Sequence, residues 1–226
     1  KQMDKELKNV IESNKEINRI WKNVGLAGYR GSVAHGTAGD VLDDIDIGGV
    51  FISPIEHYFG LSYIEHLQNT CVNEKYDFCL YEIKKFFRLL LKSNPNVLCM
   101  LWLPEHMYIQ LNDWGRQIRQ HRHLFMSKQM HSSFAGYAHG QLKRMNNPCT
   151  NQAFQGKKRK ERFEKFGYDC KNASHLIRLL KMGIETLITG EVFVQRHDAE
   201  YLKEIKNGKY SLEHITNEAN NLKTQL

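Results

Sequence analysis

The feature that most constrains this chain is the stretch from Gly28 to Phe51, in which a Gly-Ser turn precedes two aspartates in an apolar strand. Eleven residues separate Ser32 from Asp44, and the sequence DIDI then runs into GGVFI. Because side chains alternate between the faces of a strand, Asp44 and Asp46 lie on one face, about 7 Å apart, while the isoleucines face a core. The pattern predicts a buried strand that carries two carboxylates.

This pairing of carboxylates with a Gly-Ser turn indicates a site for a divalent cation and a phosphate. Hard cations such as Mg²⁺ or Mn²⁺ prefer carboxylate oxygens. Gly31 allows close backbone approach, and Ser32 could either hydrogen-bond a phosphate oxygen or cap the following helix. The alternative is a solvated acidic turn, since Asp40 and Asp43 lie nearby. The Gly-Ser pair and the apolar strand favour metal binding.

A third carboxylate normally completes such a site, and two residues compete for this role. Asp77 falls in a strand predicted over 75–81, with apolar neighbours on both sides, where an unpaired charge would be costly. Glu82 stands at the head of a helical stripe, where a carboxylate suits a capping or dipole role. We expect Asp77 to be the third carboxylate, and Glu82 remains the alternative.

The apolar spacing predicts an α/β fold in two parts, with a mixed-sheet domain over 1–105 and a mainly helical domain over 106–226. In the first part we expect an amphipathic helix over 3–21, strands over 26–30, 44–52 and 75–81, a helix over 83–91 and an irregular stretch over 53–67. In the second we expect helices over 114–124, 132–145 and 173–189, a short strand over 192–194, and a tail of two helices divided at Asn207-Gly208.

Taken together, the motifs resemble the DNA polymerase beta superfamily of nucleotidyltransferases, and further segments resemble its RNA-repair branch. Those segments are GSVAHGT at 31–37, YEIKKFFRLLLKSNPNVLCMLW at 81–102 and HLIRLLKMGIETLITGEVFV at 175–194. One departure is Arg30, which precedes the Gly-Ser pair where the superfamily usually has an apolar residue. The resemblance implies that the first part is the catalytic domain and that the helical part closes over a nucleotide.

The helical part offers basic residues for such contacts. Lys171, His175 and Arg178 are spaced four and three apart, so they share one helix face, off the apolar stripe. We expect phosphate contact from Lys171 and Arg178, whereas His175 either contacts the nucleotide or is a buried, hydrogen-bonded histidine. A second basic run, Lys157, Lys158, Arg159 and Lys160, either attracts an RNA backbone or is a solvated loop.

The charge and cysteine content bear on partners and compartment. The formal net charge is +7 and the pI about 9.1, which favours polyanionic partners. The five cysteines form no CxxC pair, which favours reduced thiols and argues against structural zinc. No apolar run approaches the roughly 20 residues of a membrane span, and the charged start KQMDKELKNVIES is unlike a signal peptide. We expect a cytoplasmic protein without a membrane partner.

The function implied by the resemblance is metal-dependent transfer of a nucleoside monophosphate from an NTP to an acceptor hydroxyl, with release of pyrophosphate. Gly31 and Ser32 would receive the triphosphate, and Asp44, Asp46 and Asp77 would hold two Mg²⁺ or Mn²⁺ ions. We expect the acceptor to be an RNA end, such as that of a tRNA. Two alternatives stay open: a protein side chain as acceptor, as in AMPylation, and a nucleotide- or RNA-binding module without catalysis.

Overall fold

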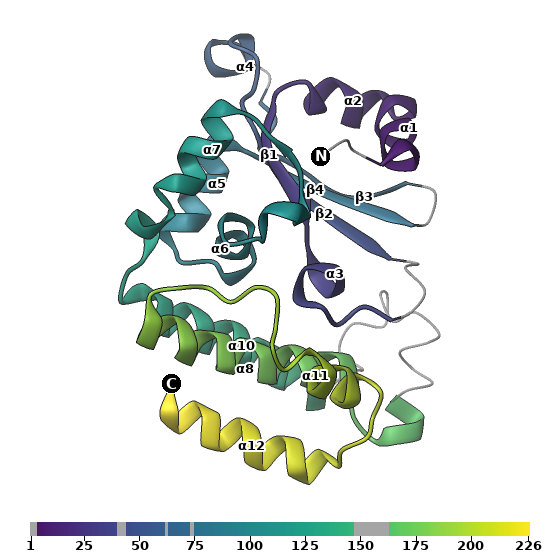
Figure 1. The fold of residues 1–226 in the computed structure, drawn as a ribbon, viewed down its shortest axis with the longest axis vertical. Helices are drawn as coiled ribbons and strands as arrows, with labels where there is room; N and C mark the ends of the chain where they lie inside the picture. Colours follow the sequence, from purple (N-terminus) through teal and green to yellow (C-terminus); the bar gives the residue numbers. More distant parts are fainter. Residues whose placement is uncertain (1–3, 40–43, 62, 73–74, 147–162) are drawn as a thin grey trace. The chain divides into compact units, whose positions relative to one another are not determined.

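The computed structural model describes residues 4–39, 44–61, 63–72, 75–146 and 163–226 (Figure 1). The chain divides into two compact units, Lys1–Met126 and Ser127–Leu226. The first unit contains a sheet with flanking helices and the second is helical, which confirms the predicted α/β class with a helical C-terminal part.

The sheet of the first unit contains five strands within the described residues, in the order β3-β4-β2-β1-β5. Its strands are β1 (Val24–Tyr29), β2 (Ile45–Phe51), β3 (His66–Val72), β4 (Tyr76–Glu82) and β5 (Tyr108–Leu111). The pair β2–β4 is parallel and the other pairs are antiparallel, so the sheet is mixed. Strands β1, β2 and β4 lie where the sequence predicts them, whereas β3 and β5 were not predicted.

Helices flank this sheet, and side-chain caps mark where several of them begin. They are α1 (Lys5–Ser13), α2 (Lys15–Trp21), α3 (Gly31–His35), α4 (Glu56–Phe59), α5 (Ile83–Leu91), α6 (Pro95–Leu101) and α7 (Asp113–Gln120). The single helix expected over 3–21 is wrong, because Asn14 interrupts it. The Asn14 side chain accepts hydrogen bonds from the backbone N–H groups of Glu16 and Ile17 and so begins a second helix.

The core of the first unit lies between α1, α2 and one face of the sheet. Ile45 and Ile47 of β2 are buried there, as the alternation in the sequence predicts. Trp21 of α2 meets Phe78 of β4 edge to face, with ring centroids 6.1 Å apart. Helix α5 contacts β2 and β4, and Figure 1 shows it on the side of the sheet away from α1 and α2. The carboxylate-bearing positions of β2 therefore face away from the α1/α2 core.

The first unit continues past residue 105, where the sequence predicts a boundary. Strand β5 pairs with β1, and α7 packs onto β1, so both belong to the sheet unit, which ends at Met126. The approach of α7 to β1 depends on two glycines. A Cβ added at Gly115 would lie 2.1 Å from the carbonyl oxygen of Gly25, and one added at Gly25 would overlap the ring of Trp114.

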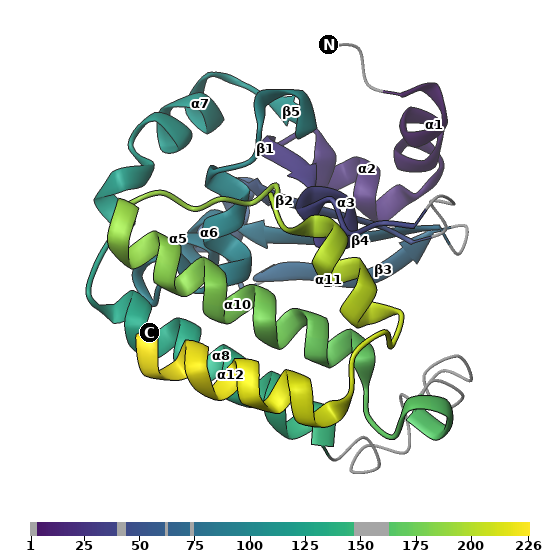
Figure 2. The same cartoon turned by 60° about the horizontal axis from the view of Figure 1, so that its bottom comes forward.

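The second unit consists of α8 (Gln129–Asn146), α10 (Cys170–Thr189), α11 (Ala199–Lys206) and α12 (Leu212–Gln225) within the part of the chain described (Figure 2). Helix α10 packs against the other three. The predicted division of the tail at Asn207-Gly208 is confirmed, but the strand expected over 192–194 is wrong, because these residues form no strand. None of the described helices is long and apolar enough to cross a membrane.

Replacement of Gly115 by alanine tests the seating of α7 on the sheet. The added methyl cannot fit against the backbone of β1, so we expect the first unit to lose about 1–3 kcal/mol of unfolding free energy in denaturant titrations. Gly136→Ala is the matched control, because nothing lies within 4 Å of a Cβ at that position in α8. It should gain about 0.5–1 kcal/mol. Equal effects of the two substitutions would contradict the packing described.

Candidate active site

Parallel pairing of β2 with β4 brings two of the expected catalytic carboxylates together. Asp46 is the register partner of Asp77, and the flanking pairs are Ile45 with Tyr76 and Ile47 with Phe78. Because those flanking residues belong to the α1/α2 core, Asp46 and Asp77 lie side by side on the opposite face. Residues 31 positions apart in the sequence thus become neighbours on adjacent strands, separated laterally by about 4.8 Å.

Asp44 lies just before β2 and is exposed. Its charge nevertheless reaches Asp77. The pKa of Asp77 is raised above its usual range, mainly because the carboxyl group is partly buried; the Arg30 charge opposes this shift and the Asp44 charge adds to it. The three expected catalytic aspartates therefore occupy one end of the sheet, although only Asp46 and Asp77 lie within strands.

One oxygen of Asp77 has no hydrogen-bond partner in the part of the chain that the structure describes. This oxygen, Oδ1, is buried. A buried polar atom without a partner costs about 1–3 kcal/mol, so it is usually retained for a ligand, an ion or a chemical step. This atom lies beside Asp46, where a cation or a donor group would supply the missing interaction.

The Gly-Ser turn fits tightly around Asp46. Gly31 adopts a φ of 56°, in the left-handed region, and a Cβ there would lie 1.9 Å from Asp46 Oδ2. The backbone N–H of Arg30 donates to the carbonyl of Asp46 over 2.8 Å. Only glycine permits both the conformation and the contact. The N-cap of α3 is Arg30, so the alternative that Ser32 is the capping residue is wrong.

Glu82, the alternative third carboxylate, has another structural role. It is fully buried at the N-cap of α5 and accepts hydrogen bonds from the Lys84 N–H, at 2.8 Å, and from the Tyr58 hydroxyl, at 2.5 Å. Burial, together with this hydrogen bond to Glu82, raises the pKa of Tyr58 to about 12. The capping role that the sequence predicts for Glu82 is confirmed, and both of its oxygens are engaged.

Arg30 is a member of the site to which the sequence assigned no role. Its side chain crosses β2 at Gly48, where an added Cβ would lie 2.1 Å from Arg30 Cδ. Burial would lower the pKa of Arg30, but the guanidinium is close enough to the Cys79 side chain on β4 and to Asp46 for both to raise it. Two features of the sequence could have indicated this role. An arginine precedes the Gly-Ser pair in place of an apolar residue, and a glycine, Gly48, stands two positions after Asp46.

The residues fit a divalent cation that is shared with a substrate. No three His, Cys, Asp or Glu side chains in the described ranges converge closely enough to hold a metal by themselves. Mg²⁺ is commonly bound by one or two carboxylates, with substrate phosphates and water completing its coordination. Asp46 and Asp77, whose Oδ1 has no partner among the described residues, supply that smaller set of ligands.

In the second unit the residues expected to contact a nucleotide differ in exposure along α10. Lys171 is exposed, His175 is half-buried and Arg178 is only 7% exposed. Arg178 lies off the apolar stripe and is nevertheless buried, because α10 is buried on more than one face. The Arg178 guanidinium lies 3.1 Å from the sulfur of Met182. The basic run Lys157 to Lys160 lies outside the described residues.

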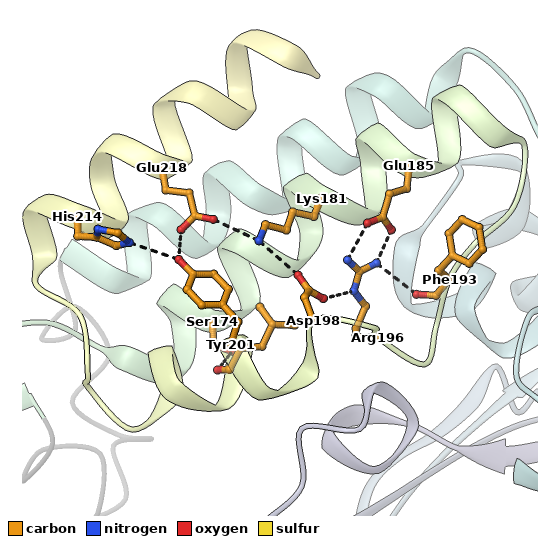
Figure 3. Close-up of polar contacts among 10 residues, drawn as sticks. Ser174, Lys181, Glu185, Phe193, Arg196, Asp198, Tyr201, His214 and Glu218 are labelled. Carbon is orange, nitrogen blue, oxygen red and sulfur yellow. Dashed lines mark hydrogen bonds and ion pairs between the residues drawn. The ribbon is translucent and has the colours of Figure 1, made fainter.

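A chain of buried and half-buried charges, missed from the sequence, joins the elements of the second unit (Figure 3). Arg196, whose side chain has no exposed surface, binds both oxygens of Glu185 on α10 and Oδ1 of Asp198, at 2.9 Å. Lys181 lies 3.4 Å from Asp198 and 3.3 Å from Glu218 on α12. Glu218 accepts a hydrogen bond from the Tyr201 hydroxyl on α11.

The pKa of Asp198 reflects its place in this network. Burial alone would raise it, but the hydrogen bond and charge of Arg196, with the charge of Lys181, outweigh burial, so the pKa is lowered. The carboxylate form is thus favoured in the folded unit. Asp198 therefore contributes to stability at neutral pH.

The fold and the site together define a class of protein. A mixed sheet that presents an aspartate pair beside a Gly-Ser turn is the arrangement expected of a polymerase beta-type nucleotidyltransferase. The model of the RNA repair pathway DNA polymerase beta family (RlaP) matches residues 1–215, and the chain belongs to this family. Family and fold support a nucleotidyltransferase.

Comparisons with curated proteins and with solved structures give less information about this chain. No curated protein matches the chain. Among solved structures, a nucleotidyltransferase-like protein from Exiguobacterium sibiricum 255-15 is similar, with 12% sequence identity and a TM-score of 0.35. The similarity covers 97% of this chain and 74% of that one. The family assignment rests on the family match and not on this structure.

The lowered pKa of Asp198 predicts acid sensitivity of the second unit. A depressed pKa gives stability that is complete above the unfolded value of about 3.9 and is lost as the pH falls through the folded value. The protection of amides in peptides from α10 and α12, measured as the exchange rate relative to the intrinsic rate at the same pH, should therefore fall below about pH 4. Asp198→Asn should exchange faster at neutral pH and show a weaker further change on acidification.

Glu200→Gln provides the control for this prediction. Glu200 pairs with Lys203 on the surface and is 85% exposed, so its loss should change little at any pH. If Asp198→Asn retained the acid response of the unaltered protein, Asp198 would not be its source.

Proposed function

We propose that this protein transfers a nucleoside monophosphate from an NTP to an acceptor hydroxyl and releases pyrophosphate. The observation that carries the proposal is the register pairing of Asp46 with Asp77 beside Gly31, within a chain of the polymerase beta type. In the transfer, the acceptor oxygen forms a bond to the α-phosphorus as the bond to the β-phosphate bridging oxygen breaks.

Each residue of the site has a defined part in this proposal. The backbone at Gly31 and the hydroxyl of Ser32, part-exposed on α3, receive the triphosphate. Asp46 and Asp77, with Asp44 at the end of the strand, would hold Mg²⁺ or Mn²⁺ together with the phosphates of the substrate. When bound, the metal neutralises charge on the attacking and leaving oxygens. Asp77 Oδ1, buried and without a partner in the described structure, accepts the proton of the attacking hydroxyl.

Substitution of the aspartate pair tests the catalytic assignment. Asp46→Asn and Asp77→Asn should each lower the rate of pyrophosphate release at saturating NTP and Mg²⁺ at least about a hundredfold, because each removes a cation ligand or the proton acceptor. Glu82→Gln should retain most of the activity of its folded fraction, since Glu82 caps α5. Circular dichroism should show folded protein for both aspartate variants.

The order of these effects decides between the two carboxylates. Should Glu82→Gln lose as much activity per folded molecule as Asp77→Asn, Asp77 would not be the third carboxylate. Ample activity in Asp46→Asn would remove the carboxylate pair from the mechanism.

We take the acceptor to be an RNA end, such as that of a tRNA. Two observations support this choice: the family is an RNA repair pathway family, and the net charge is +7 although the site itself is acidic. The positive charge therefore lies elsewhere, including Lys157, Lys158, Arg159 and Lys160. We include Lys171, which is exposed on α10, as a further phosphate contact. His175 and the buried Arg178 follow it on the same helix.

Neutralisation of the run Lys157 to Lys160 by glutamine tests this acceptor. Each cation that contacts a single strand contributes ~0.7 to the slope of log K against log salt. RNA binding by the quadruple variant should be weaker and less salt-dependent, whereas titration with a non-hydrolysable NTP should be unchanged. With labelled NTP and Mg²⁺, the unaltered protein should extend RNA. Labelling of protein alone would establish the AMPylation-type alternative. Labelling of neither RNA nor protein would establish the non-catalytic alternative.

A further inference from the structure

The side chain of Arg30 lies across strand β2 next to the candidate site, and a glycine in β2 leaves the space for it. Arg30 follows the last residue of β1, and its side chain passes over Gly48 of the neighbouring strand β2. The three atoms nearest to a Cβ built at Gly48 all belong to Arg30: Cδ at 2.1 Å, Cγ at 2.9 Å and Nε at 3.2 Å. A residue larger than glycine at position 48 would thus displace the arginine and not the backbone.

The end of this side chain lies beside the carboxylate pair. Gly48 is the register partner of Cys79, and the Arg30 guanidinium interacts electrostatically with the Cys79 side chain. Asp46 and Asp77 precede these two residues by two positions each, so they lie on the same face, about 7 Å along the strands. The Arg30 charge interacts with both carboxylates. A fixed cation therefore stands next to the place proposed for a divalent cation.

We propose that Arg30 is a positioning residue that acts as a built-in counter-ion: it holds the Asp46–Asp77 pair together without metal and weakens the binding of a free divalent cation. Uptake of the metal would then depend on the triphosphate, whose negative charges offset the guanidinium. This inference rests on the proposed function for the identity of the metal ligands. It adds that the chain itself supplies the charge that makes metal and nucleotide bind together.

The expected effect follows from Coulomb's law. A unit positive charge about 7 Å from a dication in a partly solvated site repels it enough to change affinity by at least about tenfold. A substitution that removes the charge of Arg30 should tighten Mn²⁺ binding in the absence of nucleotide. A substitution that changes the shape of the side chain but keeps its charge should not. Charge and packing can therefore be separated by choice of substituent.

The experiment measures Mn²⁺ binding to nucleotide-free protein by the loss of the free-ion electron paramagnetic resonance signal. Arg30→Met should bind Mn²⁺ about tenfold more tightly than the unaltered protein, and Arg30→Lys, which keeps the charge, should bind it as the unaltered protein does. Arg116→Met is the matched control, because Arg116 is exposed on α7; its affinity should not change. Adding a non-hydrolysable NTP should narrow the difference between Arg30→Met and the unaltered protein.

A second substitution shows whether the gained affinity belongs to the proposed site. Asp46→Asn combined with Arg30→Met should abolish the gain. If the gain survives this change, the ion is bound elsewhere and the inference is overturned. If the gain depends on Asp46 but the unaltered protein transfers no nucleotide to any acceptor, the role of Arg30 stands and the proposed function falls.

Equal Mn²⁺ affinity in Arg30→Met and the unaltered protein would overturn the inference directly, as would equal effects of Arg30→Met and Arg30→Lys. If Arg30→Met does not fold, Gly48→Ala decides the matter alone, because its methyl displaces the Arg30 side chain while leaving every charge in the protein. Its Mn²⁺ affinity should rise in the same direction, and an unchanged value would again overturn the inference.

Discussion

The parallel pairing of β2 with β4 is the interaction on which the candidate site depends. It aligns Asp46 with Asp77 and at the same time buries Ile45, Ile47 and Phe78 against α1 and α2. A shift of one residue in this register would turn the carboxylates into the core and the isoleucines into water. The apolar burial that stabilises the sheet therefore also fixes the carboxylate positions, and no separate interaction is needed to set their spacing.

Much of this arrangement was predictable because it depends on local patterns. The alternation in DIDI predicts which residues of β2 face the core, and the apolar neighbours of Asp77 predict its strand. The break at Asn14, the strands β3 and β5 and the extension of the first unit to Met126 were missed. Asn14 acts by a side-chain cap, and β5 is defined by its pairing with β1, which no local spacing reveals.

Charged residues were the hardest to place from the sequence. Helical spacing placed Arg178 on a basic face off the apolar stripe but did not reveal its burial, because α10 is packed on more than one side. The roles of Arg30 and Arg196 depend on residues of other elements. These are Gly48 and Cys79 for Arg30, and Glu185 and Asp198 for Arg196. Helical spacing shows which face a charge occupies, but not what lies opposite it.

The network around Arg196 has a consequence for the assembly of the helical unit. A guanidinium with no exposed surface is tolerable only when its acidic partners are in place, since an unpaired buried charge costs several kcal/mol. The partners come from α10 and from the segment before α11, and Lys181 extends the link to Glu218 on α12. Partial structures would leave at least one of these charges uncompensated. Burial of Arg196 therefore couples α10 to the segment before α11, and a chain truncated before α12 would leave Lys181 without one of its two acidic partners.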